Sequence, residues 1–387
     1  MMSQYSTLGE VARFTNGAAF KSSEWSEDGS RIIRIQNLTD SKKPFNRTRR
    51  PTPSSIQVHP GDLLVSWSAT LGVFEWQGPD VAVLNQHIFR VEPDYSKVDK
   101  LYLRYALVRV LDQAQRHLHG ATMKHVNKGD LLATRFFAPN LSEQRRIAEV
   151  LGRIDALRAK RRKAMALLDD LTQSIFTDMF GEPIANPHCL RESTVEEIAE
   201  KVTDGEHLTP KRESEGIKLL SARNVRSGHL DFGNVDYVGV DEYERIKRRC
   251  DPRRGDVLIS CSGTIGRVAP VETDEPFTLV RSVALIRPKR DVITTGYLAG
   301  LLQTSALKAR MLQRANASSQ ANLFQGQIKA LPVLLPPLEM QKEFDQRINQ
   351  LARLKSSHQT HLAELDALFD SAQHRAFSGE LWDDSLT

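Results

Sequence analysis

Few residues of this sequence have the types and spacing that catalysis requires. Ser260-Cys261-Ser262-Gly263 contains nucleophile-like side chains, and Ser305 and Lys308 fit a Ser-x-x-Lys pattern. A second stretch of the chain matches the first of these segments but has Trp67 in place of Cys261, so a thiol chemistry common to both copies is excluded. Ser-x-x-Lys is short enough to occur by chance, and here it falls in an amphipathic helical pattern. Neither segment is expected to be catalytic.

Other catalytic and metal-binding signatures are absent. The sequence has no phosphate-binding loop, dinucleotide-binding glycine motif, zinc-protease motif or serine-hydrolase elbow. His117, His119 and His125 suggest metal ligands, but the matching stretch of the second half has no histidine, so polar surface or nucleic-acid contact is the favoured interpretation. The three cysteines lack metal-ligand spacing. We therefore expect a binding protein with no catalytic residue, metal or cofactor of its own.

Length and composition indicate an ordinary globular protein. The chain has 387 residues with 26% charged and 40% hydrophobic side chains, which suggests several domains and excludes a disordered chain. The formal net charge of +5 is only weak evidence for a nucleic-acid partner. No apolar run is long enough to span a membrane, and the N-terminus lacks a secretion signal. With three cysteines and no paired framework, we expect a cytoplasmic protein.

An internal repeat is the strongest signal in the sequence. Residues 61–72 match residues 255–266, and more than half of these positions are identical. Residues 139–144 likewise match 336–341, and the order of matching blocks is the same in both halves. The chain is therefore interpreted as a tandem duplication. The predicted domains are a first globular domain at 1–140 with a long helix at 141–181, and a second domain at 187–337 with a long helix at 338–380.

Each globular domain is predicted to be α+β. Short segments rich in β-branched residues predict strands, and each set is followed by a segment with helical periodicity. The expected strands include 31–35, 81–84, 256–260 and 282–286, and the expected helices are 100–115 and 295–313.

Two long helices are predicted to pair with each other. Apolar residues recur at alternating spacings of four and three from Ile147 to Met179 and at the equivalent positions from Phe344 to Ala376. This spacing favours coiled-coil packing, and tandem units can lay the two helices antiparallel with pseudo-twofold symmetry. Such a pair is expected to bring like charges together. Either the helices splay there, or an acidic partner covers these residues, or they form a solvated face. The residues concerned are Arg158, Arg161, Lys355 and His358.

Polar loops occupy matching places in the two halves. Arg, Lys, Asn, Gln, Ser, Thr and His side chains in such loops can hold phosphates or read base edges, although polar loops are also the default of any surface. The loops differ between the two copies, as a reader of two different sequences requires. The candidate DNA-binding residues are Thr15, Asn16, Lys21, Arg34, Asn37, Thr122, Lys124, His125, His207, Thr209, Lys211, Arg223, Asn224, Arg226, Ser319, Gln320 and Asn322.

These motifs together resemble the specificity subunit of type I restriction–modification systems. The resemblance rests on Gly61-Asp62-Leu63-Leu64-Val65-Ser66 and its copy at 255–260, and on Pro-x-Leu-x-Glu-Gln from Pro139, with a variant from Pro336. It covers nearly the whole chain. The second helix start departs from the first, because Met340 stands where Glu143 is found in the first copy.

The resemblance implies a division of labour. Each unit would be a target-recognition domain that reads one half of an asymmetric double-stranded DNA target. The helices would set the gap between the halves and dock two methylase subunits, which bring S-adenosylmethionine and methylate adenine, and restriction subunits would join them. One alternative is a duplicated coiled-coil adaptor between proteins. Another, disfavoured by the missing catalytic motifs, is a nuclease with its own recognition domains.

Overall fold

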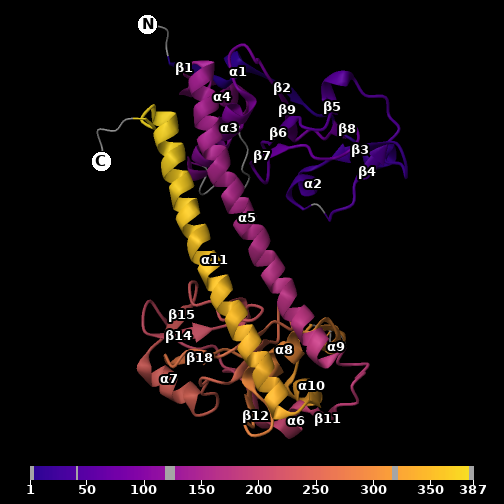
Figure 1. The fold of residues 1–387 in the computed structure, drawn as a ribbon, viewed down its shortest axis with the longest axis vertical. Coiled ribbons are helices and arrows are strands. Elements are labelled where there is room, and N and C mark those ends of the chain that lie inside the picture. Colours follow the sequence, from indigo (N-terminus) through magenta and orange to yellow (C-terminus); the bar gives the residue numbers. More distant parts are fainter. Residues whose placement is uncertain (1–3, 41, 118–126, 316–320, 383–387) are drawn as a thin grey trace. The chain divides into compact units, whose positions relative to one another are not determined.

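The two halves of the chain build closely related successions of elements. The computed structural model describes residues 4–40, 42–117, 127–315 and 321–382. The chain divides into unit 1 (residues 1–161 and 361–387) and unit 2 (residues 162–360). The long helices α5 (Leu141–Phe180) and α11 (Leu338–Ser378) are each shared between the two units (Figure 1). No helix in the described part of the chain has the length and apolarity that a membrane crossing requires.

Unit 1 contains two four-stranded sheets and a small two-stranded one. The sheets have the orders β2-β9-β6-β7, β4-β3-β8-β5 and β1-β10. All their pairings are antiparallel except that of β3 with β8. The strands are β1 (Tyr5–Thr7), β2 (Ala12–Asn16), β3 (Ser30–Ile33), β4 (Asn46–Thr48), β5 (Gln57–Val58), β6 (Leu63–Ser66), β7 (Gly72–Glu75), β8 (Ala82–Leu84), β9 (Ile88–Pro93) and β10 (Arg135–Phe137). The helices before α5 are α1 (Leu8–Val11), α2 (Ile35–Thr39), α3 (Lys100–His117) and α4 (Lys128–Ala133).

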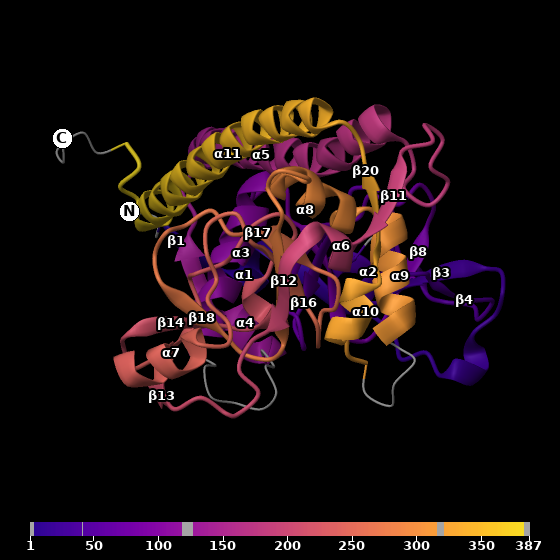
Figure 2. The ribbon, with the colours of Figure 1, turned by 90° about the horizontal axis from the view of Figure 1, so that it is seen from below.

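Unit 2 has a closely related topology, in which the second sheet differs from that of unit 1 by its added edge strand. Its sheets have the orders β12-β19-β16-β17, β13-β15-β14-β18 and β11-β20, and β14 pairs with β18 in parallel as β3 does with β8. The strands are β11 (Arg191–Thr194), β12 (Ala199–Asp204), β13 (Arg212–Glu213), β14 (Ile217–Leu220), β15 (Asp236–Val238), β16 (Val257–Ser260), β17 (Val268–Pro270), β18 (Phe277–Leu279), β19 (Val283–Pro288) and β20 (Pro332–Leu335). The helices before α11 are α6 (Val195–Ile198), α7 (Val240–Lys247), α8 (Thr295–Gln303), α9 (Ser305–Ala315) and α10 (Gln325–Lys329), and α9 and α10 lie side by side (Figure 2). The predicted α+β class with two tandem domains is confirmed.

Thr304 breaks the helix that the periodicity predicts over 295–313. Its backbone is extended (φ −57°, ψ 147°), and the residue is buried. Its hydroxyl donates to the Leu301 carbonyl at 2.7 Å and accepts from the Leu307 amide at 3.4 Å. One side chain thus caps the end of α8 and the start of α9. Sequence periodicity missed this break because both short helices keep apolar residues facing the same core.

The repeated Gly-Asp motif builds a turn and a buried ion pair. Gly255 has φ +95°, which favours glycine. Asp256 is almost fully buried; it accepts from the Arg253 amide at 2.9 Å and pairs with the Arg287 guanidinium at 2.8 Å. In unit 1 the Asp62 carboxylate pairs with the Arg90 guanidinium at 2.9 Å in the same way. The repeat is therefore kept by backbone geometry and charge pairing inside each unit.

A buried glutamine fixes the start of each long helix. In unit 1 the Gln144 side chain accepts from the Asp99 amide at 2.9 Å and donates to the carbonyls of Lys97 (3.0 Å) and Pro139 (2.8 Å). Gln341 repeats these three contacts in unit 2. Both side chains are 1% exposed. The helix start is thereby tied to the segment that precedes α3 or α8.

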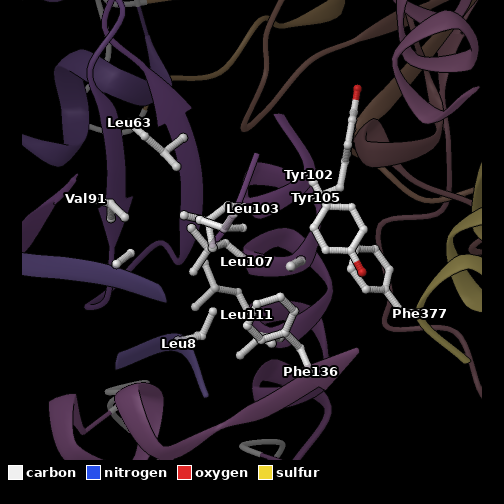
Figure 3. Close-up of a cluster of buried hydrophobic side chains, with 14 of the residues drawn as sticks. Leu8, Leu63, Val91, Tyr102, Leu103, Tyr105, Leu107, Leu111, Phe136 and Phe377 are labelled. Carbon is white, nitrogen blue, oxygen red and sulfur yellow. The ribbon is translucent and has the colours of Figure 1, made fainter. Parts of the chain in front are cut away.

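The apolar seam of both helices is buried or half-buried along the whole predicted register. In unit 1 the core includes Phe369, Ala372, Ala376 and Phe377 of α11 together with α3 and the start of α5, and Tyr102 and Phe377 lie next to each other in Figure 3. In unit 2, Phe176 and Phe180 of α5 pack on Tyr297 and Phe344. Each core is thus completed by a helix from the other half of the sequence.

The structure corrects the expectation that Arg158 lies among like charges. Its Nε donates to the Asp366 carboxylate at 2.5 Å, its Nη1 lies 3.3 Å from the Asp155 carboxylate, and its guanidinium covers the Phe369 ring at 4.3 Å. The contacts of Arg158 with Asp366 and of Arg146 with Trp382 run in opposite chain directions, so the segments of α5 and α11 in unit 1 are antiparallel. The charge of Arg158 is matched within the chain, because the pairing register differs from the expected one.

Replacing Gln341 by alanine is expected to lower the free energy of unfolding by about 2–3 kcal/mol, because it removes three hydrogen bonds and leaves the backbone groups of Thr294, Val292 and Pro336, at a buried or part-buried joint, without this partner. Chemical denaturation of the full chain measures this. Gln346→Ala on the exposed face of α11 is the matched control and should change stability by no more than about 0.5 kcal/mol. Equal effects of the two variants would contradict the anchoring role of Gln341.

Candidate nucleic-acid interface

The predicted loops of unit 2 converge at one end of its sheets. The Gln325 amide donates to the Asp204 carboxylate, the Leu323 amide to the Cys261 carbonyl at 2.9 Å, and the Arg281 amide to the Glu206 carbonyl at 2.9 Å. The Ala222 amide donates to the Ser282 hydroxyl at 3.0 Å. These bonds join segments 204–209, 221–226, 261–264, 280–282 and 321–325, which we call the loop edge of unit 2. Loops far apart in the sequence thus form one continuous surface.

Asp204 organises the polar groups of this edge. Its carboxylate accepts from the Arg249 guanidinium at 2.7 Å, lies 2.7 Å from His207 Nε2, and also accepts from Gln325. Burial opposes its ionisation, but the hydrogen bonds from Arg249, His207 and Gln325 outweigh this effect and lower the pKa of Asp204. The carboxylate is therefore charged at neutral pH and holds three donor-bearing side chains in fixed directions.

Most of the predicted cations of unit 2 are oriented by carboxylates. Arg223 Nη2 lies 3.0 Å from the Asp236 carboxylate, and Arg226 Nη2 lies 3.0 Å from that of Asp231. Both arginines are roughly half exposed, so their outer faces stay accessible. Thr209 and Lys211 are exposed. Asn322 forms a bridge with Ser262, and its Oδ1 is buried without a hydrogen-bond partner.

Unit 1 has an equivalent edge with different side chains. Asn16 is exposed at the end of β2, and its Oδ1 accepts from the indole nitrogen of Trp67 at 3.2 Å. The Trp67 ring stacks on Phe89 and lies 5.5 Å from His87, and Lys128 Nζ lies 5.6 Å above Phe89. These contacts, with the bridge between Ala18 and Asn85, join segments 16–21, 67–70, 85–89 and 127–128, which we call the loop edge of unit 1. An aromatic platform takes the place of the charged network of unit 2.

The remaining predicted residues of unit 1 have mixed roles. Thr15 is half-buried on β2, and Lys21 is exposed. Arg34 is half-buried; its Nη1 donates to Asn46 Oδ1 at 3.3 Å, and its guanidinium lies 5.7 Å from the Trp25 ring. Lys21 is therefore the most accessible cation among them.

Asn37 and Asn224 brace turns instead of facing outward. Both are buried, and each side-chain oxygen accepts from the backbone amide three residues earlier, of Arg34 or Ser221. Each side-chain nitrogen donates to two backbone carbonyls. Neither amide is left to reach a base edge, which corrects the expectation for these two positions.

The nucleophile-like segment is structural. The Ser260 hydroxyl is buried and donates to the Thr264 carbonyl, and Ser66 does the same to the Thr70 carbonyl in the copy. Burial raises the pKa of the Cys261 thiol to about 12, so the thiol stays protonated and unreactive at neutral pH. The serine fixes the turn between two strands, which explains why it recurs where Cys261 is replaced.

Five candidate residues lie outside the part of the chain that the structure describes. They are Thr122, Lys124, His125, Ser319 and Gln320. Elsewhere in the described ranges no three histidine, cysteine or acidic side chains gather as metal ligands.

The candidate residues of the sequence analysis did not include Asp204, Arg249, Gln325, Trp67 or His87, although Asp204 belongs to the polar loop that contains His207 and Thr209. Trp67 was noted only as a replacement for the thiol, and Arg249 lies just after α7, a helix that unit 1 lacks. Asp204 and Gln325 are remote in sequence. Their pairing had no local signal, although both fall inside or beside the loops whose sequences diverge between the copies.

Comparison with known proteins identifies the family of this chain. Residues 2–165 and 193–367 match the family described as "Type I restriction modification DNA specificity domain". The chain is 25% identical to the EcoBI specificity subunit of Escherichia coli, over 97% of this chain and 85% of that protein. It is 22% identical to the MjaVIII specificity subunit of Methanocaldococcus jannaschii, over 78% of this chain and 75% of that protein.

Solved structures show the same fold. The type I specificity (S) subunit from M. genitalium superposes with a TM-score of 0.57 at 14% identity, covering 96% of this chain and 95% of that one. A chain from a study of complex assembly and conformational transition of the type I restriction–modification system gives 0.56 at 19% identity, covering 97% and 98%.

Thiol reactivity checks the assignment of Cys261 as structural. At pH 8 a thiol reagent should modify the exposed Cys189 quickly, whereas Cys250 and Cys261, whose pKa values burial raises to about 12, should react only after unfolding. Counting modified cysteines by mass spectrometry, with Cys189→Ser as the control, measures this. Rapid modification of Cys261 in the folded chain would reopen the case for a thiol nucleophile.

Proposed function

Because this chain belongs to the family of type I restriction–modification specificity subunits, we propose that its two units read the two halves of one asymmetric, bipartite duplex target. The observation that carries this proposal is the pair of loop edges, built on matched scaffolds from different side chains. In unit 2, Arg249 and Gln325 donate to Asp204 and His207 lies beside them; Arg and Gln are side chains that suit guanine and adenine edges. In unit 1, Asn16, Trp67 and Lys128 offer different contacts.

The chain supplies recognition, and its partners supply chemistry. The thiol of Cys261 is protonated, and the hydroxyl of Ser260 donates its hydrogen bond to the Thr264 carbonyl. Both observations support a structural role for this segment. In this proposal two cytoplasmic methylase subunits bring S-adenosylmethionine and methylate adenine, and restriction subunits join the complex. The long helices set the gap between the half-sites and dock the methylases.

Matched exposed leucines support docking of two copies of one partner. Leu157 and Leu368 of unit 1 are 49% and 52% exposed and precede Arg158 and Phe369, which contact each other across the helix pair. Leu354 and Leu171, their equivalents in unit 2, are 47% and 41% exposed and precede Lys355 and Thr172, which line one cleft of about 930 Å³. The recurrence of these exposed leucines at equivalent positions of the two units supports one type of partner contact at each unit.

Mapping of methylated adenines in cells that express this chain with its partners tests the bipartite reading. The wild type should give one motif with two specified parts. Gln325→Ala should relax the preference in one part by about tenfold, and Asn16→Ala should relax it only in the other, because each residue belongs to a different unit. A continuous motif, or one variant that alters both parts, would contradict the proposal, and a complex indifferent to DNA would favour the adaptor.

Charged substitutions of the leucine pairs test the docking sites. Leu157→Glu with Leu368→Glu should release one methylase copy, and Leu171→Glu with Leu354→Glu should release the other, because each pair would bury a charge at an interface. Native mass spectrometry of the purified complex counts the copies. Leu312→Glu, an exposed leucine on α9, is the control and should keep both. Retention of both copies by the two double variants would place the docking surface elsewhere.

A further inference from the structure

An apolar pair distinguishes the loop edge of unit 2 from that of unit 1. Leu208 is 68% exposed and Phe324 is 52% exposed. Leu208 lies four residues after Asp204 in the sequence. Phe324 directly precedes Gln325, whose side chain donates to Asp204. Leu208 and Phe324 thus lie on two segments of the loop edge of unit 2, 204–209 and 321–325, which the bond between Gln325 and Asp204 joins.

The equivalent positions of unit 1 are used differently. Gly17 and Gly205 occupy the same place, because a Cβ on either would meet a carbonyl of the neighbouring strand end at 2.2 or 2.4 Å. Three residues further on, Phe20 is buried on Ile32, Ile56 and Val83. Leu208, its equivalent, is exposed. The Leu208 side chain is therefore not part of a hydrophobic core, whereas that of Phe20 is.

The second member of the pair shows the same contrast. Phe324 is the residue before α10, and Asn127 is the residue before the equivalent helix α4. The Asn127 side chain caps its helix by accepting from the Gly129 amide at 3.0 Å. Phe324 makes no such contact with its ring, and Gln327 caps the turn by accepting from the Phe324 amide. A polar cap in unit 1 is replaced by an exposed ring in unit 2.

The backbone that carries Leu208 is rigidly held. The Leu208 amide donates to Glu206 Oε1 at 2.8 Å. The Glu206 carboxylate is 8% exposed and pairs with the Arg245 guanidinium at 3.0 Å, and the Glu206 amide donates to the Leu279 carbonyl. An exposed leucine on a braced turn loses little conformational entropy when it binds. This preorganisation suits a recognition contact.

We propose that Leu208 and Phe324 contact the C5 methyl group of thymine in the major groove at the half-site read by unit 2. This inference rests on the proposed function and names the base chemistry of one edge. Thymine alone presents a methyl group there, and apolar side chains recognise it. The exposed Lys211 and Arg281 on the same unit are cations that suit the adjacent phosphates.

Replacement of thymine by deoxyuracil removes only this methyl group. The complete complex with its methylase partners is titrated with its mapped target, in which each thymine of the second half-site is replaced in turn. At one or two positions the wild type should bind about fourfold more weakly, the effect of one lost apolar group. Leu208→Ala or Phe324→Ala should bind both duplexes equally, and Leu208→Met should restore the difference.

Two controls separate the possible failures. Asn127→Ala, at the position equivalent to Phe324, should leave the uracil effect in the second half-site unchanged. Variants of Leu208 and Phe324 that weaken thymine and uracil duplexes by the same factor would overturn the methyl contact, as would variants that change partner binding alone. Failure of the proposed function is distinct, because the wild-type complex would then show no bipartite target at all.

Discussion

The buried glutamine at the start of each long helix is the contact on which the architecture depends. Gln144 and Gln341, whose own side chains are buried, each bond one backbone amide and two backbone carbonyls. Loss of such a group costs its full desolvation penalty, so the joint has essentially one geometry. A long helix keeps a fixed direction relative to the globular part that it anchors only if the joint between them is stiff, and this joint occurs once in each copy.

The repeated Gly-Asp motif also satisfies polar groups within each unit. The ion pairs of Asp62 with Arg90 and Asp256 with Arg287, and the turns closed by Ser66 and Ser260, satisfy the polar groups of the scaffold internally. These polar groups of the scaffold therefore need no hydrogen-bond partner from the loop edges. Those edges are free to differ, with an aromatic platform in unit 1 and a charged network with two exposed apolar side chains in unit 2. Duplication of this scaffold thus gives two loop edges whose side chains differ independently of each other.

Each unit also needs a helix from the other half of the sequence. Phe369 and Phe377 complete the core of unit 1, and Phe176 and Phe180 complete that of unit 2. Neither half of the chain contains all of its own core, so folding of the two units is expected to be coupled. This exchange also places the matched leucines of α5 and α11 in pairs, one pair in each unit.

The sequence by itself determined the duplication, the α+β class, the long helices and the family, because these depend on repeats and periodicities that are local in the chain. It also located the loops that diverge. Tertiary structure alone decided which side chains those loops present. Asn37 and Asn224 point inward because they form hydrogen bonds with backbone groups of their own turns. Asp204 contacts Arg249 and Gln325, which lie far from it in the sequence. The ion pair of Arg158 with Asp366 likewise joins residues that are 208 positions apart, and no local pattern predicts that these two side chains meet.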